Sequence, residues 1–381
     1  MIWIALLPVL TWIYLLFGRG MFWRMRERDD RDEPSQAPPT WPSVVAIVPA
    51  RDEADVIAET LASLLCQDYP GQFGIVLVDD QSGDGTGETA LARVRALGSE
   101  QRAHIVSGRP RPPGWTGKLW AMQQGMEHAL QRNAPDYVLF TDADIVHAPD
   151  NLRHLVARAE AGHLVLVSLM AKLHCRSFAE KLLIPAFVFF FDMLFPFAWA
   201  NDPRRRMAAA AGGCMLVRRD ALLAAGGIES IKDEIIDDCA LARIMKRQGP
   251  IWLGLTQRAA SIRPYGDFDE IRRMVARSAY AQLDYSPLIL GGTVLGMVVV
   301  YAAAPLLALL GSGIVRLEGV GAWAAMTLAF QPMLRFYRLP PLWGLALPAI
   351  GALYTVFTID SALQFWRGKG GMWKGRAQAI A

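Results

Sequence analysis

Three short apolar runs in the first half of this chain each end abruptly in charged residues. The runs cover residues 44–48, 75–78 and 137–141, and the residues that follow them include Pro49, Arg51 and Glu53, then Asp79 and Asp80, then Asp142 and Asp144. Short, continuous, β-branched runs are typical of strands that are buried on both faces, as in parallel sheets covered by helices. Such sheets bind ligands beyond the carboxyl ends of their strands. The pattern therefore predicts an α/β fold with one acidic crevice, which favours an enzyme that handles a metal and a charged ligand.

The third run is followed by two aspartates, Asp142 and Asp144, that are separated by one residue. Side chains at positions i and i+2 of a strand point to the same side, so both can address one centre if the strand continues through them. Mg²⁺ and Mn²⁺ take carboxylate oxygens from a protein and fill their other positions with phosphates and water. An Asp-x-Asp pattern also occurs in loops and helix caps, but its two companion strand ends favour a diphosphate site with Mg²⁺ or Mn²⁺.

Five segments, taken in order, resemble the motifs of the family 2 glycosyltransferases. They are residues 49–53, 78–86, 117–125, 141–144 and 237–241, and the resemblance covers residues 41 to about 285. It implies a GT-A fold (Rossmann-like, with a mainly parallel sheet) and an inverting transfer of sugar from a nucleotide sugar. Residues 114–118, 236–241 and 373–376 are similar to the hopanoid-biosynthesis-associated branch of this family. Related carotenoid and lipid glycosyltransferases share much of the same sequence pattern around these motifs.

The resemblance also implies a role for each matched residue. The nucleotide-sugar site would comprise Pro49, Arg51 and Glu53 around the nucleoside, Asp80 or its neighbour Asp79 at the base, and Lys118 and Asp142 near the diphosphate. Asp142 and Asp144 would hold the metal, and Asp238 would be the catalytic base on the acceptor hydroxyl. An inverting displacement needs such a base and a cation at the leaving group. Asp238 has a plainer interpretation as the start of a helix, because acidic residues open its segment and basic ones close it.

One segment departs from the family pattern. Processive members carry a Gln-x-x-Arg-Trp segment after the base, whereas residues 270–274 here read Glu-Ile-Arg-Arg-Met. We therefore expect the transfer of a single sugar. Two other functional classes stay open at this point: a nucleotidyltransferase, which also uses a metal-bound nucleotide, and a non-catalytic membrane scaffold that has kept a nucleotide pocket.

The chain is unusually apolar, with 53% hydrophobic residues among 381. Residues 2–18 carry no charge and are long enough to span a bilayer. Arginines follow from Arg19 to Arg28, so the positive-inside rule places the downstream domain in the cytoplasm and the protein in the inner (cytoplasmic) membrane. The expected organisation is an N-terminal transmembrane anchor at 1–20, a linker at 21–42, a glycosyltransferase domain at 43–285 and C-terminal transmembrane helices at 286–381.

The C-terminal region contains three apolar segments, at residues 288–310, 320–334 and 342–365, the last interrupted by Asp360. If the anchor and all three segments cross, the basic, aromatic tail at 366–376 lies outside, against the positive-inside rule. Either one segment is re-entrant, or the orientation was already fixed earlier in the chain. The aromatic stretch 182–200 suits an interfacial or acceptor-lining helix. The amphipathic stretch 268–283 suits either a helix on an anionic surface or one in the domain's own core.

The formal net charge of +3 is too small to indicate nucleic-acid binding, and the arginines cluster near predicted membrane faces instead. The expected partners are therefore a nucleotide-sugar donor, a lipid acceptor and the membrane, with no nucleic acid. The four cysteines, at positions 66, 175, 214 and 239, show no metal-ligand spacing and are expected to be reduced in a cytoplasmic domain. The sequence gives no indication of the oligomeric state.

Overall fold

The computed structural model describes residues 2–31, 37–132, 134–368, 372–373 and 376–377. The chain forms two compact units that interleave along the sequence. We call them the sheet unit, which contains residues 27–173 and 199–263, and the helical unit, which contains residues up to 26, 174–198 and 264–368. A short hairpin, β9 (Met372–Trp373) with β10 (Arg376–Ala377), follows near the C-terminus.

The sheet unit is built on eight strands in the order β3-β2-β1-β4-β7-β6-β8-β5. Their bounds are β1 Val44–Ala50, β2 Phe73–Asp79, β3 Ala103–Ser107, β4 Tyr137–Thr141, β5 Ile145–His147, β6 Leu166–Lys172, β7 Cys214–Arg218 and β8 Ile251–Ser261. The three apolar runs are β1, β2 and β4, which pair in parallel as predicted. However, β7 runs antiparallel to both β4 and β6, and β5 runs antiparallel to β8. The sheet is therefore mixed rather than mainly parallel.

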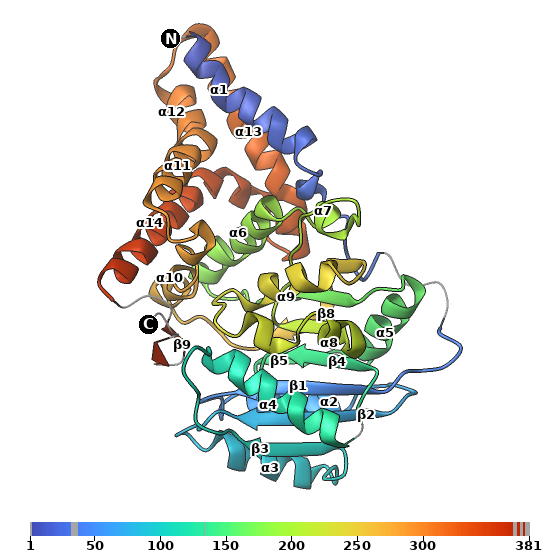
Figure 1. Cartoon of the computed structure of the whole chain (residues 1–381). Helices are drawn as coiled ribbons and strands as arrows, with labels where there is room; N and C mark the ends of the chain where they lie inside the picture. The colour runs from blue at the N-terminus through green and yellow to red at the C-terminus, as the bar shows by residue number, and fades with distance from the viewer. Residues whose placement is uncertain (1, 32–36, 133, 369–371, 374–375, 378–381) are drawn as a thin grey trace. The chain divides into compact units, whose positions relative to one another are not determined.

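Successive residues of the central strands point into two different cores, which explains why these strands lack polar alternation. In β1, Ala46 and Val48 join one core while Ile47 joins the other. In β4, Leu139 and Phe140 divide in the same way. Helices α2 and α5 pack on the first core, and α4 and α9 on the second (Figure 1). The helices of this unit are α2 Ile57–Leu65, α3 Thr86–Ala96, α4 Gly117–Arg132, α5 Asn151–Ala161, α8 Arg219–Ala224, η3 Ile228–Ile231 and α9 Asp237–Lys246.

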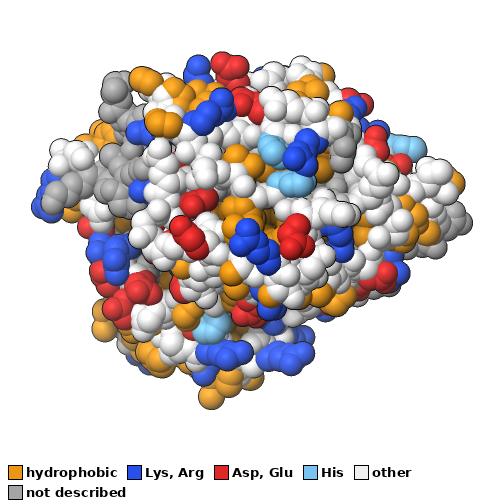
Figure 2. Space-filling view, turned by 90° about the horizontal axis from the view of Figure 1, so that it is seen from below, with side chains coloured by type: hydrophobic (Ala, Val, Ile, Leu, Met, Phe, Trp, Pro, Cys, Tyr) orange, Lys and Arg blue, Asp and Glu red, His pale blue; other side chains and the backbone are white. Residues whose placement is uncertain are grey.

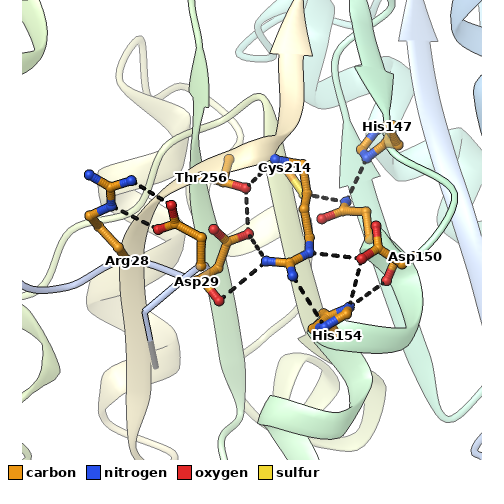
Figure 3. Close-up of polar contacts among 10 residues, drawn as sticks. Arg28, Asp29, His147, Asp150, His154, Cys214 and Thr256 are labelled. Atoms are coloured by element: carbon orange, nitrogen blue, oxygen red, sulfur yellow. Dashed lines mark hydrogen bonds and ion pairs between the residues drawn. The ribbon is translucent and has the colours of Figure 1, made fainter. Parts of the chain in front are cut away.

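Part of the predicted linker is built into the sheet unit. Arg28 forms a parallel bridge with Leu255 of β8, and the Asp29 amide donates to the Leu255 carbonyl at 3.0 Å. The Asp29 side chain is only 4% exposed and is reached by Arg258, which also donates to Asp150 at 3.1 Å (Figure 3). Because a buried carboxylate needs a partner, this ion pair ties residues 27–29 firmly to β8.

The helical unit contains three helices long and apolar enough to cross a membrane, at residues 287–310, 313–336 and 341–366. A further apolar helical stretch, Leu6–Gly18, is shorter than these three, so the N-terminal anchor stays a prediction. The elements are α1 Ile2–Ile13, η1 Tyr14–Gly18, η2 Phe22–Arg24, α6 Phe178–Leu194, α10 Phe268–Ala276, η4 Ala281–Leu283, α11 Pro287–Met297, η5 Val298–Ala302, α12 Ala303–Leu310, α13 Gly313–Phe336, η6 Pro341–Ala346 and α14 Leu347–Trp366. The short helix α7 (Phe197–Asn201) lies where the chain passes between the units.

The two amphipathic or aromatic stretches noted in the sequence both pack against these apolar helices. In α6, Phe189 contacts Phe330 of α13 with ring centroids 5.1 Å apart, and Phe190 contacts Tyr354 of α14 at 5.0 Å. In α10, the apolar face is buried through Ile271 and the residues around Val275. The buried side of α10 therefore contacts protein, and α10 belongs to the helical unit rather than to the core of the predicted glycosyltransferase domain.

Candidate active site

The loops that follow β1 and β2 are locked together at the carboxyl edge of the sheet. Arg51 donates through Nη1 to the carbonyls of Asp80 and Gln81, the latter at 3.1 Å, and Asp80 is fully buried. The amide of Glu53 donates to Thr86 Oγ1 at 2.8 Å. Two polar residues in these loops, Asp52 and Gln81, have positive φ angles of 51° and 56°. Non-glycine residues seldom adopt this conformation, and it clusters at functional sites. The fold thus brings the predicted nucleoside residues together; Pro49 lies near the end of β1 and Asp79 ends β2.

Asp142 and Asp144 lie in the turn between β4 and β5, but not in the geometry that the sequence argument assumed. Strand β4 ends at Thr141, so the strand does not continue through the pair. Asp142 Oδ1 accepts from Lys118 Nζ at 2.9 Å, while Asp144 Oδ2 accepts from Ser261 Oγ at 2.7 Å. Within the described residues, no group of three or more His, Cys, Asp or Glu side chains could hold a metal ion. The protein side of the predicted metal site is therefore two carboxylates.

Lys118, in the first turn of α4, bridges two acidic elements. Its ammonium lies 2.9 Å from Asp142 Oδ1 and 3.0 Å from Asp237 Oδ2, which belongs to α9. Burial alone lowers the pKa of Lys118, but the two carboxylates outweigh it and raise that pKa, so the lysine stays charged. A Cβ atom at Gly212 would come within 3.1 Å of Lys118 Nζ, so a larger residue there would crowd the ammonium.

Asp238, the predicted base, lies beside this ion pair in the first turn of α9. Its Oδ2 accepts from the Gly212 amide at 3.0 Å and its Oδ1 from the Cys239 amide at 2.7 Å. Burial, and after it the neighbouring charge of Asp237, raises the pKa of Asp238 to about 6. The residue thus starts a helix, as its plainer interpretation requires, and also has the perturbed pKa that functional acids and bases often show.

Ser261 and Arg263, at and just after the end of β8, also contact the predicted site residues, although the sequence did not predict them. Arg263 forms an ion pair with Glu53 and approaches Asp144 Oδ2 through Nε at 3.6 Å. It thus links a predicted nucleoside residue, Glu53, to the predicted metal motif. Its only signal in the sequence is a charge that follows an apolar run, as in the other three strands. Its position could not be predicted, because it depends on the antiparallel pairing of β8 with β5.

His147, three residues after Asp144, is the last residue of β5 and has a structural role. Its buried ring contacts Thr141 Oγ1 through Nε2 at 2.9 Å and Asn151 Nδ2 through Nδ1 at 2.8 Å. Burial lowers its pKa to about 4, so it is neutral near pH 7. In Figure 3 the ring points toward the neighbouring helix α5 and is held there.

A cavity of about 290 Å³ lies elsewhere, at the opposite ends of β1 and β4. Its lining includes Tyr137, Glu160, Arg218 and Asp220, and no predicted site residue. Tyr137 donates to Glu160 at 2.6 Å and accepts from Arg218 at 2.8 Å, so these three polar side chains of the cavity wall bond to one another.

The face of the molecule in Figure 2 carries acidic and basic side chains interspersed rather than a field of one sign.

The chain is similar to known glycosyltransferases in sequence and in fold. Residues 45–224 match the sequence model of the family described as Glycosyl transferase family 2. The chain is 29% identical over 202 residues to an N-acetylglucosaminyltransferase of Mesorhizobium japonicum, which covers 50% of this chain and 42% of that protein. It is 26% identical over 125 residues to an undecaprenyl-phosphate 4-deoxy-4-formamido-L-arabinose transferase of Klebsiella pneumoniae, covering 32% of this chain and 35% of that one. The chain thus spans less than half the length of these two relatives.

Among solved structures, the chain is similar to a mannosyltransferase from Pyrobaculum calidifontis in complex with GDP-Man and Mn²⁺. The TM-score is 0.55 with 20% sequence identity, over 96% of this chain and 99% of that one. This is a likeness of fold, and it extends over the helical unit as well as the sheet unit. Residues 45–224 thus resemble the glycosyltransferase family 2 sequence model, and the chain as a whole shares its mixed α/β fold with this mannosyltransferase.

Proposed function

We propose that this protein is a membrane-bound inverting glycosyltransferase that moves one sugar from a nucleotide sugar to a lipid acceptor. The observation that carries the proposal is the juxtaposition of Asp238 with the Lys118 ion pair inside a family 2 domain. A base with a raised pKa stands next to a cation and a carboxylate of the metal motif. Displacement with inversion needs a base on the acceptor side and positive charge on the leaving-group side.

In the proposed reaction, Asp238 takes the proton of an acceptor hydroxyl while the oxygen of that hydroxyl attacks the anomeric carbon of the sugar. The bond from that carbon to the nucleoside diphosphate breaks, and the diphosphate leaves with the electron pair. Lys118 lies within reach of Asp142 and offers positive charge on the leaving-group side. Arg51, Glu53 and the Asp79–Asp80 turn would surround the nucleoside.

The residues at the metal motif fit Mg²⁺ or Mn²⁺. Two carboxylates, Asp142 and Asp144, supply hard oxygen ligands, and such ions usually complete their coordination with substrate phosphate and water. When bound, the ion would offset negative charge on the diphosphate. The Mn²⁺ in the mannosyltransferase of similar fold supports this proposal, as does its GDP-Man for the donor class.

The acceptor is proposed to be a lipid because three apolar helices of membrane-crossing length accompany the domain. The name of the Klebsiella relative, which contains undecaprenyl phosphate, supports the same class. Hopanoids are the first acceptors to test, given the resemblance of residues 114–118 and 236–241. The sheet unit, residues 27–173 and 199–263, would lie in the cytoplasm, where nucleotide sugars are made, with the protein in the inner membrane.

The test is to incubate membranes that contain the full chain with a panel of labelled nucleotide sugars and extracted lipids, and to identify products by mass spectrometry. We expect one lipid species to gain one sugar, with release of a nucleoside diphosphate. Transfer of the nucleotide with release of pyrophosphate would instead identify a nucleotidyltransferase. Retention of bound donor without any product, across the whole lipid panel, would favour the non-catalytic scaffold.

A further inference from the structure

The third long apolar segment of the helical unit, η6 with α14, has the length and composition to cross a membrane. From its neighbours we infer that it does not cross. It is a re-entrant hairpin that enters and leaves through the membrane face where α11 begins, and its outer surface contacts the lipids of that one leaflet. This inference concerns the membrane contact of residues 341–366 and is independent of the proposed chemistry.

Two long helical segments serve as the reference for the hairpin: the α11–α12 rod, which consists of α11, η5 and α12, and the helix α13. They are joined by a short turn at Gly311 and Ser312, and they run side by side (Figure 1). They pack closely, since a Cβ atom at Gly319 of α13 would lie 2.3 Å from the amide nitrogen of Ala308. In such an antiparallel pair, the start of α11 at Ser286 and the end of α13 at Phe336 lie at the same face. The Gly311 turn lies at the other face.

The first limb of the hairpin, η6, runs back along α13 toward the middle of the membrane. Gln331 donates to the carbonyl of Pro341 at 3.0 Å, and Thr327 donates to that of Gly344 at 3.3 Å. Trp323 donates to the carbonyl of Leu345 at 3.2 Å. As the residue numbers rise along η6, the numbers of the contacting residues fall along α13, so η6 runs antiparallel to α13. The deepest of these contacts, Trp323, is near the middle of α13 (313–336) and not at its far end.

The second limb, α14, returns to the face from which η6 started. Near its beginning, a Cβ at Gly351 would lie 2.6 Å from the Tyr301 ring, in the middle of the α11–α12 rod. Further on, Ala362 packs with Leu290 and Tyr280. At the end, the Phe365 ring stacks on Tyr285 with centroids 4.5 Å apart. Helix α14 therefore runs from the middle of the α11–α12 rod toward the residues just before α11, so both ends of the hairpin are at one face.

The polar groups of α14 agree with this arrangement. Asp360 forms an ion pair with Arg272 of α10 and also accepts from Gln364 Nε2 at 2.6 Å. Ser361 accepts from the amide of Tyr280 at 3.0 Å. A charged side chain is costly at the centre of a bilayer, whereas near the interface it is tolerated. The return of α14 places Asp360 beside residues that precede α11, and therefore near the membrane interface.

The outer surface of the hairpin fits lipid acyl chains. Leu342 is 74% exposed and Val356 is 56% exposed, and Leu345 and Leu363 add to this surface. Helices α11 and α13 also expose apolar residues, among them Leu295 and Leu328. A hairpin of this kind also removes the conflict with the positive-inside rule. Arg335, Arg338 and Arg367 would then all lie on the Ser286 side of the membrane.

Cysteine labelling of the full chain tests the inference. In a background of Cys66→Ser and Cys175→Ser, single variants Gln282→Cys, Ser312→Cys and Gly368→Cys are compared in spheroplasts with an impermeant maleimide, before and after permeabilisation. Gln282, Ser312 and Gly368 are all exposed. We expect Ser312→Cys to be labelled from outside, and the other two only after permeabilisation. Cys214 and Cys239 are buried and stay unlabelled in native protein.

The inference is overturned if Gly368→Cys is labelled together with Ser312→Cys, because α14 then crosses. It is also overturned if Gln282→Cys and Ser312→Cys react from the same side, because the reference pair then does not cross. An inverted result, with positions 282 and 368 both outside and 312 inside, keeps the hairpin and reverses only its orientation. A green fluorescent protein fused after Ala381 gives a second reading without a substitution: fluorescence supports a cytoplasmic tail, and its absence with normal insertion contradicts one.

Discussion

At the scale of single residues, the chemistry proposed for this protein depends on a chain of charges. Lys118 joins Asp142 to Asp237, and Asp237 acts on Asp238 through space. Arg263 makes the corresponding link between Glu53 and Asp144. Removing one member of a partly buried ion pair leaves the other uncompensated, which is costly. Substitutions here should therefore change shape and length as little as possible.

We predict that Asp238→Asn loses most sugar transfer and keeps donor binding. Without general-base assistance the rate should fall by about 10²–10⁴-fold. Asn can still accept from one of the two amides that Asp238 now satisfies, so the loss of stability should be about 0.5–1.5 kcal/mol. Turnover at saturating donor and acceptor, together with calorimetric donor affinity, checks this. Near-normal turnover would return Asp238 to a structural role and make Asp237 the next candidate.

The raised pKa of Asp238 leads to a prediction about pH. An ordinary aspartate, with a pKa near 3.8, would stay ionised down to about pH 4, whereas Asp238 should become protonated as the pH falls through about 6. Because only the ionised form accepts a proton, kcat should fall about tenfold per pH unit below that value. The profile is measured between pH 4.5 and 8, with the amount of folded protein followed in parallel. A flat profile down to pH 4.5 would contradict the role of this group.

We also predict that Asp142→Asn and Asp144→Asn weaken donor binding in the presence of Mn²⁺. Each substitution removes one negative charge and leaves the shape almost unchanged, so the loss should appear as reduced metal dependence. Calorimetry with and without Mn²⁺ measures it, and Asp68→Asn is the matched control, since Asp68 is an exposed carboxylate paired with Arg153. Binding of full strength in both variants, unaffected by a chelator, would rule out the metal assignment.

At the scale of elements, the segment that leads to Gly212 is held by one side chain of α9. Lys246 Nζ donates to the carbonyls of Ala200 and Met207 at 2.6 Å each and to that of Asp202 at 3.0 Å. The same helix carries Asp238 in its first turn. A single ammonium thus fixes residues 199–207 to the helix that presents the proposed base.

We predict that Lys246→Met loosens this segment. Methionine has a similar length but no donor, and the carbonyls would lose charge-assisted hydrogen bonds worth about 1.5–3 kcal/mol each in favourable cases. Arg204 is 88% exposed in its side chain, so opening should increase trypsin cleavage at Arg204–Arg206. Arg243→Ala is the control, because Arg243 lies on the same helix and forms only an exposed pair with Glu234. Equal cleavage of both variants and the parent would show that the carbonyl contacts of Lys246 contribute little.

At the scale of the whole molecule, the two units are built from alternating segments of one chain. Residues 174–198 leave the sheet unit after β6 and join the helical unit, and residue 199 onward returns. The helical unit is thus assembled from three separate stretches. A substitution in α6 can for this reason affect membrane insertion, although α6 lies within the sequence region of the glycosyltransferase motifs.

We predict that the sheet unit lies entirely in the cytoplasm. Cys66 is exposed and belongs to this unit, so the unmodified protein already contains a reporter. An impermeant maleimide should label it only after the membrane is opened. Ser312→Cys in the otherwise native chain provides the positive control for labelling from outside. Labelling of Cys66 in intact spheroplasts would overturn the predicted topology.

The sequence by itself determined the strands β1, β2 and β4 and the residues at their carboxyl ends. Continuous apolar runs such as 44–48 and 137–141 indicate burial on both faces, and this local pattern can be recognised without knowledge of the fold. The segment motifs also indicated Lys118 and Asp238, and the structure brings them together beside Gly212. The strands were recognisable from their own apolar patterns, whereas Lys118 and Asp238 were indicated by the resemblance to the family 2 motifs.

Only the tertiary structure decided which strands are neighbours, and with them the position of Arg263. The pairing of β8 with β5, and the reversed β7, depend on contacts between residues more than 70 positions apart in the chain, such as Thr141 with Cys214. The same holds for α14, whose composition permits a crossing while its contacts with Tyr301 and Tyr285 return it to one face. Composition reports how much apolar surface a segment must bury. Where that surface lies, and against what, depends on the packing of segments that are distant in the sequence.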